Sequence, residues 1–272
     1  MTARLDDCFS TLRAAGRKAL VAYLCVGDPS LEESVELCVA AARAGADLLE
    51  LGVPFSDPTA DGPAIARASQ RAIRGGATIL RVLEVAAEVG RTAHVPMVLF
   101  GYYNPILVTG EARVVPLAAG AGIDAMLVVD LPPEEGETLR TAAAGAGVAM
   151  IPLVTPTTDA ARLDAISAAR PSGFMYYVSV TGVTGVAAPA LARASTEAAR
   201  LRARMRLPVV VGFGIDGPAA AREAAGPRGG GADGIVVGTA IVRRIEEASS
   251  PAARVLAVRS LVSDLRAALD GS

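Results

Sequence analysis

Eight short apolar stretches recur along the chain, and this repetition constrains the fold more than any other feature of the sequence. Each stretch is a near-continuous run of apolar residues rather than an alternation of apolar and polar ones. Such runs are typical of strands buried on both faces of a parallel sheet. The runs are Ala19–Val26, Asp47–Gly52, Pro96–Tyr102, Ala125–Leu131, Ala149–Val154, Phe174–Val180, Pro208–Ile215 and Gly234–Val242.

The segments between these runs are typical of helices, and one more helix is expected before the first strand. The predicted helices are Arg4–Ala15, Leu31–Ala44, Thr78–Gly90, Pro133–Gly145, Asp159–Arg170, Leu191–Arg206, Pro218–Ala225 and Pro251–Leu269. This alternation predicts an α/β fold: a single (β/α)8 TIM barrel with an additional N-terminal helix, forming one domain over residues 1–272. A doubly wound open sheet is the alternative, although its usual glycine fingerprint is missing from the first turn, Val26–Pro29.

The charged residues exclude several classes of function. The chain has 26 basic and 28 acidic residues, and this balance argues against binding to nucleic acid or to an anionic membrane. His94 is the only histidine and Lys18 is the only lysine. Each precedes a predicted strand, whereas barrel enzymes place catalytic groups where strands end. The sequence therefore excludes a Schiff-base lysine and leaves carboxylates, hydroxyls and backbone amides.

The cysteines and the N-terminus indicate where the protein resides. Cys8, Cys25 and Cys38 are odd in number and lack metal-ligand spacing, as is typical of reduced thiols inside the cell. The N-terminal residues are not those of a signal peptide, and no apolar stretch approaches the roughly 18 residues of a membrane span. We expect a cytoplasmic protein.

Acidic residues follow the second predicted strand and lie inside it. Glu50 is flanked by leucines, where desolvation is costly and raises a carboxyl pKa toward the range useful for acid–base catalysis. The next loop holds Asp57 and Asp61 between prolines that restrict the backbone. A glutamate paired by a salt bridge and ordinary turn chemistry remain the alternative interpretations.

Glycine-rich turns follow the last three predicted strands. They are Thr181–Gly185, Val211–Ile215 and Val237–Ala240. Glycines let backbone N–H groups approach an anion, and the loops after strands 7 and 8 often bind phosphate in this fold. Each of these glycine pairs alone could be an ordinary tight turn, but three of them on adjacent strands favour a phosphate site. The first, Thr181–Gly185, could also act as a mobile lid.

Several motifs together resemble the tryptophan synthase α chain family. The most specific is the continuous segment Glu50–Pro63, which reads ELGVPFSDPTADGP. Agreement continues in order over nearly the whole chain, at Gly27–Pro29, Tyr102–Pro105, Asp130–Pro132, Pro156–Thr158, Gly182–Gly185 and Gly212–Ile215.

The resemblance implies a carbon–carbon lyase of tryptophan biosynthesis. Members of this family cleave indole-3-glycerol phosphate to indole and glyceraldehyde 3-phosphate, and pass indole to a pyridoxal-phosphate-dependent β subunit in a heterotetramer. The resemblance implies no cofactor and no metal in this chain. A stand-alone lyase that releases free indole is the alternative, and a non-catalytic activator of a β-like partner is a third hypothesis.

The resemblance also implies roles for individual residues. It makes Glu50 the acid–base residue, Asp61 its partner near the indole N–H, and Tyr176 a tyrosine close to the glutamate. The implied phosphate-binding positions are Gly185, Gly214, Gly238 and Thr239. The implied pocket and lid residues are Tyr23, Phe100, Tyr102, Asp130, Thr184 and Phe213. The implied partner interface includes Asp57, Pro58, Asn104 and Pro105.

A few positions depart from the common pattern of the family. Phe100-Gly101 replaces a methionine and a small hydroxyl residue, and Thr239 stands where serine is usual. Asp216 follows the glycine turn where serine is usual. Since a carboxylate facing the phosphate would weaken binding, we expect Asp216 to cap the following helix.

Overall fold

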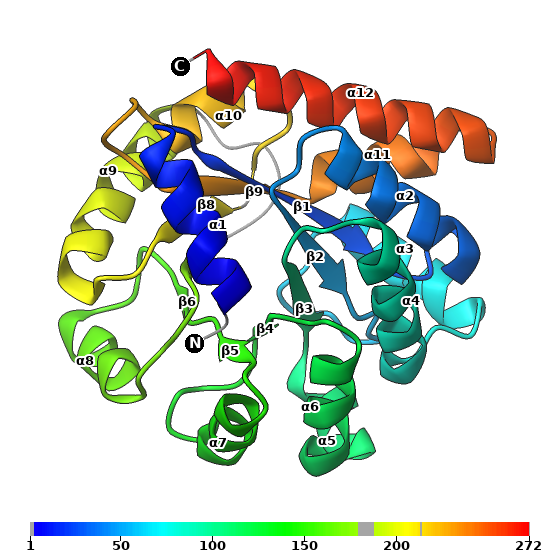
Figure 1. The fold of residues 1–272 in the computed structure, drawn as a ribbon, viewed down its shortest axis with the longest axis horizontal. Helices are drawn as coiled ribbons and strands as arrows, with labels where there is room; N and C mark the ends of the chain where they lie inside the picture. The colour runs from blue at the N-terminus through cyan, green and yellow to red at the C-terminus, as the bar shows by residue number, and fades with distance from the viewer. Residues whose placement is uncertain (1–2, 179–187, 213, 272) are drawn as a thin grey trace.

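Parallel pairing of the apolar runs organises the chain. The computed structural model describes residues 3–178, 188–212 and 214–271, and Figure 1 shows its strands surrounded by helices. The strands are β1 (Ala19–Cys25), β2 (Leu48–Gly52), β3 (Met97–Gly101), β4 (Ala125–Val128), β5 (Ala149–Met150), β6 (Leu153–Val154), β7 (Met175–Val178), β8 (Val209–Gly212) and β9 (Gly234–Val237). They pair in parallel in the order β5-β4-β3-β2-β1-β9-β8-β7-β6.

Except for α1, which precedes the first strand, the helices follow strands and cover the outside of the sheet. They are α1 (Ala3–Ala14), α2 (Leu31–Arg43), α3 (Pro63–Arg74), α4 (Ile79–Thr92), α5 (Tyr103–Thr109), α6 (Glu111–Gly120), α7 (Glu137–Gly145), α8 (Ala160–Ala168), α9 (Ala188–Met205), α10 (Pro218–Ala225), α11 (Thr239–Glu247) and α12 (Pro251–Asp270). Within the described ranges, no helix combines the length and the apolar character needed to span a membrane.

The two ends of the sheet meet within one predicted strand, Ala149–Val154. β5 pairs with β4, and β6 pairs with β7. Between them, the Ile151 N–H donates to the carbonyl of Met126 at 2.9 Å, and the Pro152 carbonyl accepts from the Tyr176 N–H at 2.9 Å. Proline has no N–H to donate, so the ladder is interrupted there. β5 and β6 therefore occupy one strand position that bonds to both of its neighbours, and this closes the predicted TIM barrel. The alternative of a doubly wound open sheet is wrong.

Alternate residues of each strand face two different cores. In β1, Leu20, Ala22 and Leu24 pack outward against the helices, whereas Val21 and Tyr23 belong to the cluster inside the barrel. All seven residues of β1 are buried. Burial on both faces explains why the strands read as continuous apolar runs.

The predicted N-terminal helix is present as α1, and it packs against the barrel interior from the end where the strands begin. Leu5, Phe9 and Leu12 are buried in the same cluster as the inward-facing strand residues. The ring of Phe9 lies 5.5 Å from that of Phe174, just before β7. In Figure 1, α1 crosses the front of the strands.

Several elements differ from the sequence prediction. The last predicted strand, Gly234–Val242, is wrong beyond Val237, because Thr239 begins α11 and its apolar residues follow a helical period. The helices α3, α5 and α6 were not predicted either. Pro116 lies inside α6, where proline argues against a helix. The helix α3 is strongly amphipathic, but its buried face consists largely of alanines and holds only one large apolar residue, Ile65.

Candidate active site

Glu50 lies inside the barrel on β2. It is paired in register with Tyr23 of β1 and is 1% exposed. Its Oε1 atom has no hydrogen-bond partner among the residues that the structure describes. Burial, and then the nearby charge of Asp61, raises the pKa of Glu50 from its ordinary value of 4.5 to about 8. Glu50 therefore holds a proton at neutral pH.

Asp61 lies in the loop between β2 and α3, and Tyr102 orients it. The Tyr102 hydroxyl donates to Oδ2 of Asp61 at 3.1 Å and accepts from the Ala60 N–H at 2.9 Å. Burial raises the pKa of Asp61 to about 6, and the hydrogen bond from Tyr102 opposes this rise. Two neighbouring carboxyl groups thus have pKa values on opposite sides of pH 7, which suits them to separate roles in acid–base chemistry.

Two tyrosines fill the barrel beside these carboxyl groups. Tyr176 of β7 is buried, and its pKa is raised first by burial and then by the charges of the two carboxyl groups. A Cβ atom added at Gly212 would collide with the Tyr176 hydroxyl, and one added at Gly52 would collide with the Tyr23 hydroxyl. Glycine at the ends of β2 and β8 therefore makes room for the tyrosine side chains.

The remaining wall of this region is apolar. Phe100 of β3 packs edge-on against Tyr23, with ring centroids 5.4 Å apart and an interplanar angle of 81°. The ring of Phe55 lies 5.1 Å from that of Tyr102. The carboxyl groups of Glu50 and Asp61 thus border aromatic surface, on which a flat apolar ring can pack.

The turns after β8 and β9 have the backbone geometry expected of them. Gly214 has a φ of 76°, a conformation that favours glycine. Gly238 is the N-cap residue of α11, and Thr239 is its first residue. Gly217 occupies the N-cap position of α10, so the expectation that Asp216 caps this helix is wrong. The other predicted residues of these turns and of the lid, Thr184, Gly185 and Phe213, lie outside the described residues.

The predicted interface residues lie in two segments at the ends of β2 and β3. Asp57 is exposed and Pro58 partly exposed in the loop before Asp61, and Asn104 and Pro105 lie in the first turn of α5. Asp130 follows β4 and has a different hydrogen-bond partner from the carboxyl pair. Its Oδ1 atom accepts from the Tyr103 N–H at 2.7 Å at the start of α5, and it lines a cavity of about 300 Å³.

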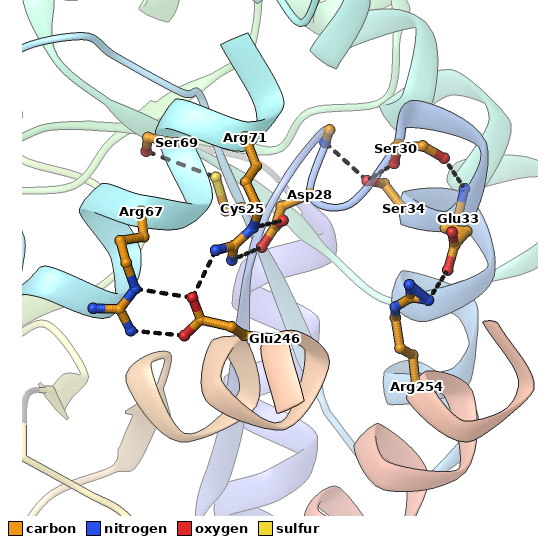
Figure 2. Close-up of polar contacts among 11 residues, drawn as sticks. Cys25, Asp28, Ser30, Glu33, Ser34, Arg67, Ser69, Arg71, Glu246 and Arg254 are labelled. Carbon is orange, nitrogen blue, oxygen red and sulfur yellow. Dashed lines mark hydrogen bonds and ion pairs between the residues drawn. The ribbon is translucent and has the colours of Figure 1, made fainter. Parts of the chain in front are cut away.

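One polar cluster was not predicted from the sequence. Asp28, directly after β1, binds Arg71 of α3, which also binds Glu246 of α11 (Figure 2). Arg67 of α3 binds the same glutamate. The available signal was Asp28 in the Gly27–Pro29 motif, to which the sequence analysis assigned no partner.

Comparison with known proteins identifies this arrangement. The family model described as tryptophan synthase alpha chain matches residues 9–269. The chain is 46% identical to the tryptophan synthase alpha chain of Geotalea daltonii over 90% of its length and 91% of that protein. The corresponding protein of Citrifermentans bemidjiense is also 46% identical, over 90% of each chain.

Solved structures agree with the sequence relatives. Tryptophan synthase subunit alpha from Legionella pneumophila superimposes with a TM-score of 0.89 at 35% identity, over 99% of each chain. A structure of Mycobacterium tuberculosis tryptophan synthase gives a TM-score of 0.86 at 33% identity, again over 99% of each chain. The chain therefore belongs to the tryptophan synthase alpha chain family, whose members are lyases that cleave indole-3-glycerol phosphate.

Proposed function

We propose that Glu50 and Asp61 carry out the retro-aldol cleavage of indole-3-glycerol phosphate in this chain. The observation that supports this most is the pair of buried carboxyl groups, with pKa values of about 8 for Glu50 and about 6 for Asp61. Near pH 7 the first is an acid and the second an anion. The reaction requires both, because a ring carbon gains a proton while positive charge develops on the ring.

The proton transfers balance within the site. Protonated Glu50 gives its proton to the indole carbon that bears the side chain, and the ionised Asp61 stabilises the resulting cationic ring at its N–H. The carbon–carbon bond then breaks, and its electron pair returns to the ring. The hydroxyl proton of the side chain passes to Glu50, which regenerates the acid as the aldehyde forms. We propose that Tyr176 packs beside Glu50 during these steps.

We propose that the phosphate group binds at the turns after β8 and β9. Gly214 and the Gly238-Thr239 pair supply backbone N–H groups, and Thr239 adds a hydroxyl at the N-terminus of α11. The positive end of a helix dipole favours an anion there. Gly185 would contribute from the turn after β7, with Thr184 in the lid. The indole ring would pack against Tyr23, Phe100 and Phe213.

The replacement Glu50→Gln tests the proposed acid–base role. The amide keeps the shape of the side chain but does not exchange a proton, so we expect indole formation by the purified chain to fall to background. Circular dichroism checks that the variant is folded. The matched control is Glu84→Gln, the same change in an exposed ion pair on α4. Near-normal turnover by the Glu50 variant would refute the mechanism.

We propose that the chain works as the α subunit beside a pyridoxal-phosphate-dependent β chain in the cytoplasm. An exposed apolar surface on α5 supports this: Leu107 is 56% exposed and Val108 is 80% exposed, next to Asn104 and Pro105. Exposed apolar clusters of this kind mark protein contacts. The curated relatives named above are tryptophan synthase alpha chains, so they do not favour the stand-alone lyase.

Turnover with and without the partner separates these two possibilities. We expect a purified β chain to raise the rate of indole-3-glycerol phosphate cleavage strongly and to co-elute with this chain in size-exclusion chromatography. Fast turnover that does not respond to any added β chain would support the stand-alone lyase. The control mixture contains a β chain and the Glu50→Gln variant, which should form the complex without cleaving the substrate.

A further inference from the structure

The cluster of Asp28, Arg67, Arg71 and Glu246 is a continuous brace between three elements (Figure 2). The Nε and Nη2 atoms of Arg71 donate to the two carboxylate oxygens of Asp28 at 2.7 and 2.9 Å. The Nη1 atom of the same guanidinium donates to Oε1 of Glu246 at 2.7 Å. Arg67 holds Glu246 through two further hydrogen bonds of 2.9 and 2.7 Å.

The brace is electrostatically complete. Its two arginines balance two carboxylates, and the Asp28 side chain at its inner end is only 2% exposed. The hydrogen bonds to Arg67 and Arg71 lower the pKa of Glu246 to about 2. Glu246 and the arginines therefore keep their charges throughout the pH range in which the enzyme would work, so the brace is a constant support rather than a pH switch.

The brace connects the two halves of the proposed site. Arg71 lies on α3, the helix that begins two residues after Asp61. Glu246 lies on α11, the helix that begins at Thr239. The brace therefore joins the helix that follows the proposed catalytic aspartate to the helix whose N-terminus is proposed to bind phosphate. Its third attachment, Asp28, fixes both helices to the end of β1.

We propose that Arg71 is a positioning residue that fixes Asp61 relative to the phosphate-binding turn of α11 by holding Asp28 and Glu246 at the same time. This inference rests on the proposed function, because it concerns the distance between the proposed acid–base pair and the proposed phosphate site. A substrate that is held at both ends reacts well only when the distance between the acid–base pair and the phosphate site stays constant.

The chemistry at this position requires arginine. Its planar guanidinium offers donors in two directions, so one side chain binds Asp28 with two hydrogen bonds and Glu246 with a third. A lysine ammonium is a compact charge that lacks this fork geometry. At 1.5 Å per residue, Arg71 lies about 12 Å from the N-terminus of α3 and Glu246 about 10 Å from the N-terminus of α11. A shift there is carried by the helices to the site.

The test removes the brace without leaving a buried charge unpaired. The double variant Asp28→Asn/Arg71→Met is neutral at both positions, which avoids the unfolding that loss of Arg71 alone could cause. Since displacements of about 1 Å can reduce rates by as much as 100-fold, we expect kcat for indole-3-glycerol phosphate cleavage to fall at least tenfold. Arg81→Met, which breaks an exposed pair on α4, is the control and should change kcat less than twofold.

The pH profile distinguishes positioning from a general loss of stability. Release of α3 should expose Asp61 to water, lower its pKa and move the acidic limb of the kcat/KM profile to lower pH. Arg71→Lys keeps the positive charge but cannot make all three guanidinium hydrogen bonds, so its kcat should lie between those of the wild type and the double variant. The inference is overturned if the lysine or double variant has wild-type kcat and an unshifted limb, or if loss of folded protein accounts for the whole decrease. Failure of the proposed function itself would appear separately, as activity of Glu50→Gln.

Discussion

The buried carboxyl group of Glu50 should make the active enzyme less stable than an inactive variant. Raising its pKa from 4.5 to about 8 means that the folded protein holds a proton that the unfolded chain has already released. Between these two values, the unfolding free energy falls as pH rises, by about 1.4 kcal/mol per pH unit for this group. Below pH 4.5 both states are protonated, and above about 8 both are ionised.

These values set the magnitude of the effect. At pH 7, the cost of keeping Glu50 buried is about 3 kcal/mol, and above pH 8 it reaches about 5 kcal/mol. Glu50→Gln removes the titrating group and keeps its shape. The stability of this variant relative to wild type should therefore rise by about 3 kcal/mol between pH 4.5 and pH 7, whatever constant difference the amide adds.

Urea unfolding of both proteins at several pH values measures this difference. Comparison at each pH cancels the contribution of Asp61 to first order, because both proteins keep that carboxyl group. The exposed Glu84→Gln replacement on α4 is the matched control for the change from carboxylate to amide. A difference between Glu50→Gln and wild type that stays constant from pH 4.5 to pH 8 would contradict the reasoning about burial.

Three further replacements probe other parts of the molecule. Tyr102→Phe removes the hydrogen bond that lowers the pKa of Asp61, so the acidic limb of the kcat/KM profile should move above pH 6. An unmoved limb would show that this hydrogen bond does not control the pKa of Asp61. Gly212→Ala should displace Tyr176 and lower kcat at least tenfold in a folded protein by circular dichroism; wild-type kcat would argue against a role for that tyrosine. Val108→Asp should weaken β-chain binding in size-exclusion chromatography and leave unaided turnover unchanged; intact binding would exclude α5 from the interface.

The sequence predicted the barrel because the same physics acts on every strand. Burial on two faces imposes a continuous apolar run. The predicted helices α2 and α8 are capped at their starts by Ser30 and Asp159, which accept backbone N–H groups at 3.2 and 2.8 Å. Lys18 lies just before β1, as predicted, and its Nζ donates to the carbonyl of Ala232 at 2.6 Å. The boundary of β9 was wrong because the apolar residues of α11 continue the strand's composition.

The sequence supplied candidate site residues and the direction of the Glu50 pKa shift, but it did not supply the hydrogen bonds that join distant residues. Glu50 could be singled out because a carboxylate in a buried strand is rare, and Asp61 because it lies in a motif after that strand. The hydrogen bond between Tyr102 and Asp61 joins residues 41 positions apart. Arg71 and Glu246 are 175 positions apart and occupy ordinary helical sequence. No local sequence pattern indicates contacts between residues so far apart in the chain, because only folding brings them together.

The helix α1 gives the barrel a closed bottom. Leu5, Phe9 and Leu12 pack into the interior, so among the residues that the structure describes the barrel is filled at the end where the strands begin. The opposite end, where the strands end, is the side from which α5 projects its exposed apolar residues. If the proposed function holds, indole freed at the site would leave on the side that carries the surface proposed for the partner. The first helix of the chain would in that case direct the product toward the partner by filling the opposite end of the barrel.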